Sequence, residues 1–123
     1  MKAYTDLSQS KKLAEILPIE SADMKWFVPA DNEGEFIEKV SLITYKSEYT
    51  LFDKVTDWND TPYLPCWSLA ALLKELPDTM LGKDKDGYVV MVETMGSGLT
   101  AFASNPIDAC YEMIIKIHEQ KLL

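Results

Sequence analysis

The expected fold is organised around residues 65–77, which read PCWSLAALLKELP. Four leucines, at positions 69, 72, 73 and 76, follow the i, i+3, i+4, i+7 spacing of one helix face. Ser68 is a good N-cap because its hydroxyl can accept a free backbone N–H in the first turn. Pro77 lacks the N–H that a helix needs and disfavours helical geometry at Leu76. The pattern predicts a short, deeply buried helix with Trp67 at its entrance.

A second helix is expected near the N-terminus, over residues 5–17. Thr5 or Ser8 can cap it, its apolar residues form a narrow face, and Pro18 ends it. Residues 21–24 could open one further helical turn, with Ser21 as its cap.

The third helix has the strongest start signal. Residues 105–108 read NPID, which supplies an Asn cap, a proline at the first helical position and an acid in the first turn. We expect this helix to reach about Gln120. Its buried stripe is expected to contain Ile107, Cys110, Ile114 and Ile117.

Short β-branched or aromatic segments are expected as strands at residues 26–28, 40–46, 49–52, 88–93 and 99–103. The last two should form a hairpin around the glycine-rich turn at residues 95–98. Residues 53–64 and 82–87 are expected as loops, the second of them solvated. These elements predict an α+β fold. A single domain over residues 1–123 should pack about three helices on one face of a small antiparallel sheet of three to four strands.

The charge of the chain argues against nucleic acid as a partner. The formal net charge is −8, and all 12 positive charges are lysines. Nucleic-acid binders normally carry a basic face with arginines for bidentate contacts, whereas an acidic surface repels phosphate and membrane headgroups. Such a surface attracts basic proteins, although the charge also serves solubility. We also expect no membrane contact and a cytoplasmic location, since no long apolar run or signal peptide is visible.

The sequence offers few groups for catalysis. His118 is the only histidine and falls at the end of the last helix, two turns from Cys110. Cys66 and Cys110 have no metal-ligand spacing and are expected as buried free thiols. The acidic residues Asp53, Asp57 and Asp60 lack the spacing of a calcium loop. We therefore predict no catalytic residue, no cofactor and no metal site.

Several segments together resemble a family of small uncharacterised proteins from gut bacteria of the Bacteroides group and their prophages or mobile elements. The segments that carry the resemblance are residues 9–13, 21–24, 65–73, 105–109 and 112–114, with Glu119. The resemblance implies a cytoplasmic accessory protein of mobile-element origin. It implies no activity and no catalytic residue.

Two hypotheses on function follow. The preferred one is a non-enzymatic module that binds another protein, as an adaptor, an inhibitor or a homo-oligomer. Its expected contact residues are the aromatic side chains of Trp26, Trp58 and Tyr63. The alternative is a small-molecule-binding or hydrolytic protein with a pocket near the 88–103 hairpin. A pocket lined by Trp and Tyr with convergent polar groups would favour the alternative, whereas a flat apolar patch would favour the preferred hypothesis.

Overall fold

The computed structural model describes residues 2–27, 40–42, 63–94 and 97–120. The chain divides into two compact units. The inserted unit is Asp6–Ser68, and the discontinuous unit combines Met1–Thr5 with Leu69–Leu123. The prediction of a single domain for the whole chain stays a prediction.

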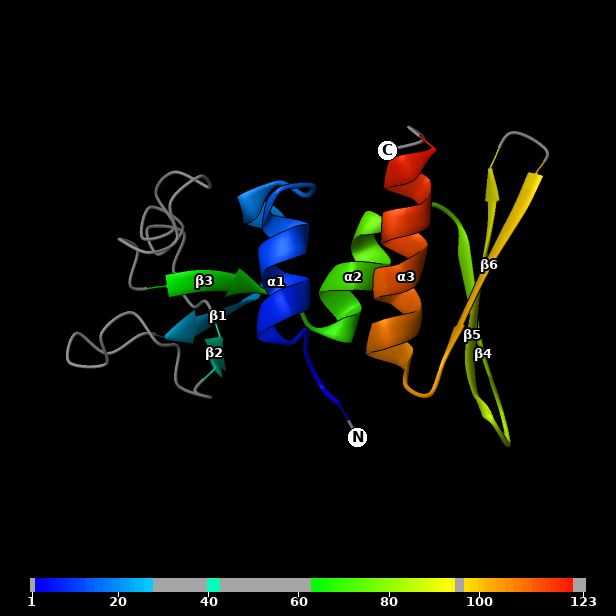
Figure 1. The fold of residues 1–123 in the computed structure, drawn as a ribbon, viewed down its shortest axis with the longest axis horizontal. Coiled ribbons are helices and arrows are strands. Elements are labelled where there is room, and N and C mark those ends of the chain that lie inside the picture. Colours follow the sequence, from blue (N-terminus) through cyan, green and yellow to red (C-terminus); the bar gives the residue numbers. More distant parts are fainter. Residues whose placement is uncertain (1, 28–39, 43–62, 95–96, 121–123) are drawn as a thin grey trace. The chain divides into compact units, whose positions relative to one another are not determined.

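The inserted unit contains one helix and one small antiparallel sheet (Figure 1). The helix is α1 (Leu7–Ala14), followed by a 3₁₀ turn at Ile19–Ser21. The sheet has the order β2-β1-β3, and its strands are β1 (Met24–Phe27), β2 (Val40–Leu42) and β3 (Tyr63–Cys66). The central strand pairs Trp26 with Val40 on one side and with Leu64 on the other.

Helix α1 is shorter than the predicted span of residues 5–17, and its cap is Asp6 rather than Thr5 or Ser8. The Asp6 carboxylate accepts the backbone N–H of Gln9 at 2.8 Å, and the Gln9 side chain accepts that of Asp6 at 3.1 Å. This reciprocal capping box satisfies two N–H groups of the first turn, which explains why the helix begins there.

The further helical turn predicted for residues 21–24 is wrong, because the 3₁₀ turn ends at Ser21 and Met24 begins β1. Asp23 instead accepts the backbone N–H of Ser68 at 2.9 Å and also its hydroxyl. The Ser21 hydroxyl accepts the indole N–H of the fully buried Trp67 at 2.9 Å. Asp23 and Ser21 therefore accept hydrogen bonds from Ser68 and Trp67, at the C-terminal end of the inserted unit.

The discontinuous unit contains α2 (Leu69–Glu75), α3 (Pro106–Glu119) and a second antiparallel sheet. That sheet has the order β4-β5-β6, with β4 (Thr79–Asp84), β5 (Gly87–Thr94) and β6 (Ser97–Ala103). Helix α3 packs against β5, β6 and α2 (Figure 1). The expected helix after Trp67 is confirmed, and its Leu72 is fully buried.

The predicted start of α3 is confirmed in atomic detail. The Asn105 side chain accepts the backbone N–H of Asp108 at 2.9 Å, and Pro106 is the first helical residue. Lys2 donates to the Asp108 carboxylate at 2.8 Å and so ties the N-terminal segment to α3. The four predicted residues of the stripe are fully buried, as is Met113.

The solvated loop predicted at residues 82–87 is wrong. Gly82 to Asp84 belong to β4, and only Lys85 and Asp86 form the turn that leads into β5. The Asp84 carboxylate accepts the backbone N–H groups of Asp86 and Gly87 at 2.7 and 3.1 Å, which stabilises the tight turn. A segment of glycines and charges is held as a strand by its pairing with β5 rather than by its own composition.

The α+β fold with small antiparallel sheets is confirmed. The described strands are divided between two three-stranded sheets, where a single sheet was expected. The strands predicted at residues 26–28 and 40–46 appear in part as β1 and β2, and the hairpin of β5 and β6 is confirmed. The strand expected at residues 49–52 and most of the loop at 53–64 lie outside the described residues. No helix in the described parts of the chain is long and apolar enough to cross a membrane.

Candidate interaction surface

The two faces of the β4-β5-β6 sheet differ sharply in exposure. Side chains alternate between the faces along each strand, and directly paired residues share a face. One face carries the buried side chains of Val90, Val92 and Ala101, together with Leu81 at its edge, which is 37% exposed. The other carries Met80, Met91 and Phe102, which are 68%, 42% and 54% exposed. Large apolar side chains are thus presented to solvent from all three strands.

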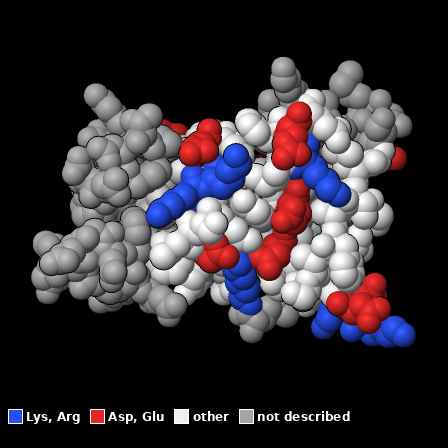
Figure 2. All heavy atoms as spheres, viewed as in Figure 1, with Lys and Arg blue, Asp and Glu red and all other residues white. Residues whose placement is uncertain are grey.

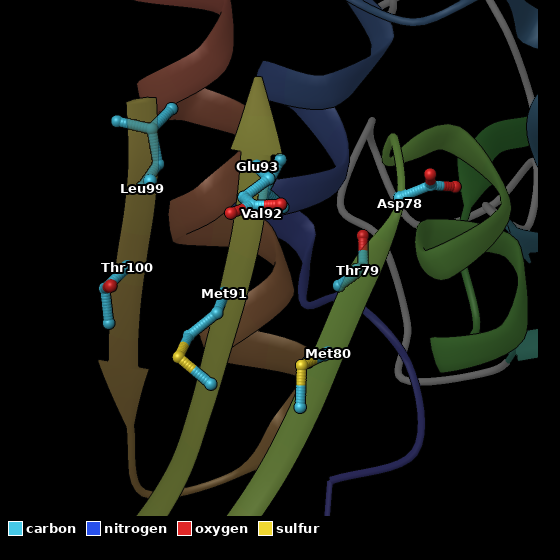
Figure 3. Close-up of a pocket in the computed structure, with 9 residues that line it drawn as sticks. Asp78, Thr79, Met80, Met91, Val92, Glu93, Leu99 and Thr100 are labelled. Atoms are coloured by element: carbon cyan, nitrogen blue, oxygen red, sulfur yellow. The ribbon is translucent and has the colours of Figure 1, made fainter. Parts of the chain in front are cut away.

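We call this second surface the open face. The pairing register aligns its residues in rows across the sheet, Met80 with Met91 and Thr100, and Gly82 with Val89 and Phe102. By the same alternation, Glu93 and its partner Gly98 form a further row at the end of the sheet near Asp78. Figure 3 shows Met80 and Met91 on neighbouring strands in front of the sheet, with α3 behind it.

A groove of about 460 Å³ opens on this face (Figure 3). Residues from two rows of the open face line it, together with Thr79, Val92 and Leu99 from the row between them. The open-face residues in its lining are Asp78, Met80, Met91, Glu93, Gly98 and Thr100. A Cβ atom added at Gly98 would meet no heavy atom within 4 Å, so the glycine leaves this part of the groove unfilled.

The charges at the groove are of one sign. Asp78 and Glu93 line it and are exposed, and its lining contains no lysine, histidine or cysteine. The lysines of the sheet and of α3 lie outside the groove lining. The Lys116 ammonium donates to the Thr100 carbonyl at 2.6 Å, and that of Lys83 lies 5.8 Å from the centre of the Tyr88 ring. Lys85 lies in the turn before β5, whose first residue, Gly87, is itself about 20 Å from Glu93 at ~3.4 Å per residue.

The three aromatic residues predicted as contacts belong to the inserted unit, and the structure describes them only in part. Trp26 is only 5% exposed and donates its indole N–H to the Ser10 hydroxyl at 3.3 Å, so its assignment to an interaction surface is wrong. A buried indole needs such a partner, and α1 supplies it. Tyr63 is the first residue of β3, where it pairs with Phe27. Trp58 lies outside the described residues.

Sequence reasoning did not identify Met80 and Met91. The sequence places Met80, Gly82 and Asp84 at alternate positions, and likewise Val89 and Met91 further along the chain. Such alternation is typical of strands that present one set of side chains on one face. It went unused because residues 82–87 were interpreted as a loop, so the strand partner of β5 on this side was missing from the predicted sheet.

The cysteines and the histidine considered for catalysis are not among the residues that line the groove. Cys66 and Cys110 are buried thiols that form no disulfide, as expected, and burial raises the pKa of the Cys110 thiol to about 11. A thiol with a raised pKa is a weak nucleophile at neutral pH. His118 is exposed at the end of α3. Within the described residues, no group of three or more His, Cys, Asp or Glu side chains is placed to hold a metal ion.

None of the family models, curated proteins or solved structures with which the chain was compared matches it.

Proposed function

We propose that the protein is a non-enzymatic module that binds another protein through the open face of its β4-β5-β6 sheet. The observation that carries the proposal is the exposure of Met80, Met91 and Phe102 on three neighbouring strands. Exposed apolar groups that cluster in this way are typical of sites where a protein meets a partner, whereas single exposed apolar residues are ordinary.

Methionine is well suited to such a surface. Its unbranched side chain has three rotatable bonds and a polarisable sulfur, so it adapts to partners of different shape. Two methionines that face each other across β4 and β5 can therefore reshape the groove when an apolar side chain enters it. Aromatic and methionine residues are also enriched at the centres of protein interfaces, where Phe102 would contribute the largest rigid contact.

The groove also supports the alternative function, because it lies beside the predicted hairpin. Its volume is within the range of about 300–1,000 Å³ that is usual for small-molecule sites. However, it lies on the surface of a sheet and lacks the Trp and Tyr lining that the alternative requires. A drug-sized ligand is normally 70–90% buried in its site, which a surface groove of this kind does not provide. We therefore prefer a polypeptide as the occupant.

Site-specific photocrosslinking tests this proposal. Phe102 is replaced by benzoylphenylalanine, which keeps an aromatic ring at the exposed position, and the full-length protein is irradiated in its native cells. A matched control carries the same group at Glu112, an exposed residue of α3. We expect a discrete crosslinked protein from position 102 and not from position 112. No crosslink at position 102, or the same products from both positions, would contradict the proposal.

The cytoplasmic location and the association with mobile elements remain part of this proposal. They are supported by the resemblance of the segments at residues 9–13, 65–73 and 105–109 to the small Bacteroides-group proteins. Visualising a fluorescent fusion of the full chain in its native cell would test the location directly.

A further inference from the structure

We propose that the partner contributes a basic apolar segment to the groove, with an apolar side chain between Met80 and Met91 and a lysine or arginine beside Asp78 and Glu93. This inference rests on the proposed function, since it names the kind of partner that the open face binds. It commits to one occupant on the ground of charge complementarity at the groove.

The apolar walls and the acidic end of the groove come from consecutive rows of the open face. Met80 and Met91 pair directly across β4 and β5, so their side chains form the apolar walls of the groove. Glu93 is two residues further along β5 and points to the same face, about 7 Å away at ~3.4 Å per residue. Asp78 immediately precedes β4 and also lines the groove, and its carboxylate is directed away from Glu93 (Figure 3). A single peptide segment can therefore reach both features.

No described lysine is among the residues that line the groove, where Asp78 and Glu93 are the charged residues. Lys85 precedes β5, and the strand alone spans about 20 Å between Gly87 and Glu93, more than two Debye lengths at physiological ionic strength, where that length is about 8 Å. Lys116 belongs to α3, which packs against β5 and β6, and its ammonium already donates to a backbone carbonyl. An incoming lysine or arginine would therefore meet an acidic groove lining that contains no competing lysine.

The surface charge favours a basic partner over a second copy of this chain. A second copy would bring another net charge of −8 and the same two carboxylates. Figure 2 shows lysines and carboxylates intermixed on the face in view, including the charged turn between β4 and β5. The groove differs from this mixed pattern because both of its charged residues are acidic. Self-association through the open face is therefore an outcome that would overturn the inference.

A pair of model peptides tests the charge and the position of the site. The first is a short amphipathic peptide of leucine and lysine with blocked ends, and the second has every lysine replaced by glutamate. Binding is followed by NMR of the full-length protein labelled at the methionine methyl groups. We expect the lysine peptide to shift the methyl signals of Met80 and Met91 and to leave that of the fully buried Met113 in place. The glutamate peptide should cause no shift.

Charge-matched variants show whether the groove itself is responsible. Asp78→Lys with Glu93→Lys should weaken binding of the lysine peptide about tenfold, since rim charges tune affinity moderately. The control, Asp86→Lys with Glu112→Lys, makes the same change in net charge at exposed positions outside the groove and should weaken it less than about threefold. Equal losses in both variants would show general attraction to an acidic protein and would overturn the inference.

Apolar variants test the walls of the groove. Met80→Ser with Met91→Ser should weaken the peptide about tenfold, because it removes the apolar contacts. The control, Leu81→Ser, removes a partly exposed apolar side chain of β4 that does not line the groove, so it should have less than about a threefold effect. A larger effect at Leu81 than at the methionines would place the peptide elsewhere and contradict the inference.

Two results separate this inference from the proposed function. If photocrosslinking from position 102 succeeds but reversal of the Asp78 and Glu93 charges has no effect on the lysine peptide, the protein-binding function stands and the basic partner is wrong. If sedimentation shows a dimer that Met80→Ser dissociates, the occupant is a second copy, and the basic partner is again wrong.

Discussion

Replacing Gly87 with alanine should destabilise the discontinuous unit because there is no room for a side chain at this position. Gly87 has a φ angle of 154°, a conformation that residues with a side chain rarely adopt. A Cβ atom built there would lie 2.5 Å from the carbonyl oxygen of Ala103 and 3.0 Å from the Phe102 ring. The ring can rotate away, but the carbonyl belongs to the backbone of β6, so the strands themselves must shift.

The size of the effect follows from three contributions. A residue held in a sparsely populated backbone region costs about 1–3 kcal/mol. The contact with Ala103 adds strain from displaced strands, whereas alanine recovers about 0.4–1 kcal/mol by restricting the unfolded chain. We therefore expect the free energy of unfolding to fall by about 2–3 kcal/mol, which is a large fraction of the 5–15 kcal/mol that is usual for a small protein.

The measurement is urea unfolding followed by far-ultraviolet circular dichroism, together with amide exchange in β5 and β6. Gly98→Ala is the matched control, because it lies in the same hairpin and its added Cβ meets nothing within 4 Å. We expect Gly98→Ala to lower the free energy of unfolding by less than about 0.5 kcal/mol. A loss below ~1 kcal/mol at Gly87, or equal losses at both glycines, would refute the argument from backbone contact.

Four further outcomes are expected. Leu72→Ala should lower the free energy of unfolding by about 2–5 kcal/mol in urea, because the side chain is fully buried in α2; a loss below ~1 kcal/mol would show that the helix is peripheral. Asn105→Ala should cost about 1–2 kcal/mol in the same assay, since it removes the cap of α3. Cys110 should resist alkylation in the native state at neutral pH. Because burial raises its pKa from 9.0 to about 11, the folded state holds the proton more tightly. Stability should therefore lose the contribution of this thiol as pH rises from about 9 to 11, and a Cys110→Ala variant should show a smaller loss over that range. Random duplex DNA should show no gel shift at about 0.15 M ionic strength, and micromolar retardation would contradict the prediction drawn from the net charge.

The helices were predictable because their signals are local. Asn105 and Pro106 specify the start of α3 within two residues, and the leucine spacing specifies the buried face of α2. The start of α1 was missed by one or two residues because a capping box depends on the pair formed by Asp6 and Gln9. Local sequence therefore predicted which segments are helical more accurately than it predicted their ends.

The strand β4 and the groove could not be predicted from local signals. Gly82 to Asp84 have a loop-like composition, and their extended conformation depends on hydrogen bonding with β5. Without β4 in the predicted sheet, Met80 has no assigned face, and Met80 and Met91 cannot be placed together.

The prediction of aromatic contact residues failed at Trp26 for a related reason. Trp26 was interpreted as a contact residue, but its polar group is satisfied inside the unit by Ser10, a partner that sequence spacing does not reveal.

Lys2 and Asp108 are joined across 106 positions of the sequence, so the discontinuous unit cannot be completed until α3 has been synthesised. On the ribosome, the whole of Asp6–Ser68 is synthesised before any residue of α2, β4 or α3. Residues 2–5 can therefore contact α3 only after it has been synthesised, whereas the inserted unit can begin to fold earlier. Joining the ends of a flexible loop costs only about 0.6 kcal/mol more for each doubling of its length. The chain between Thr5 and Leu69 should accordingly tolerate insertions, provided that they leave the strands of the inserted unit intact.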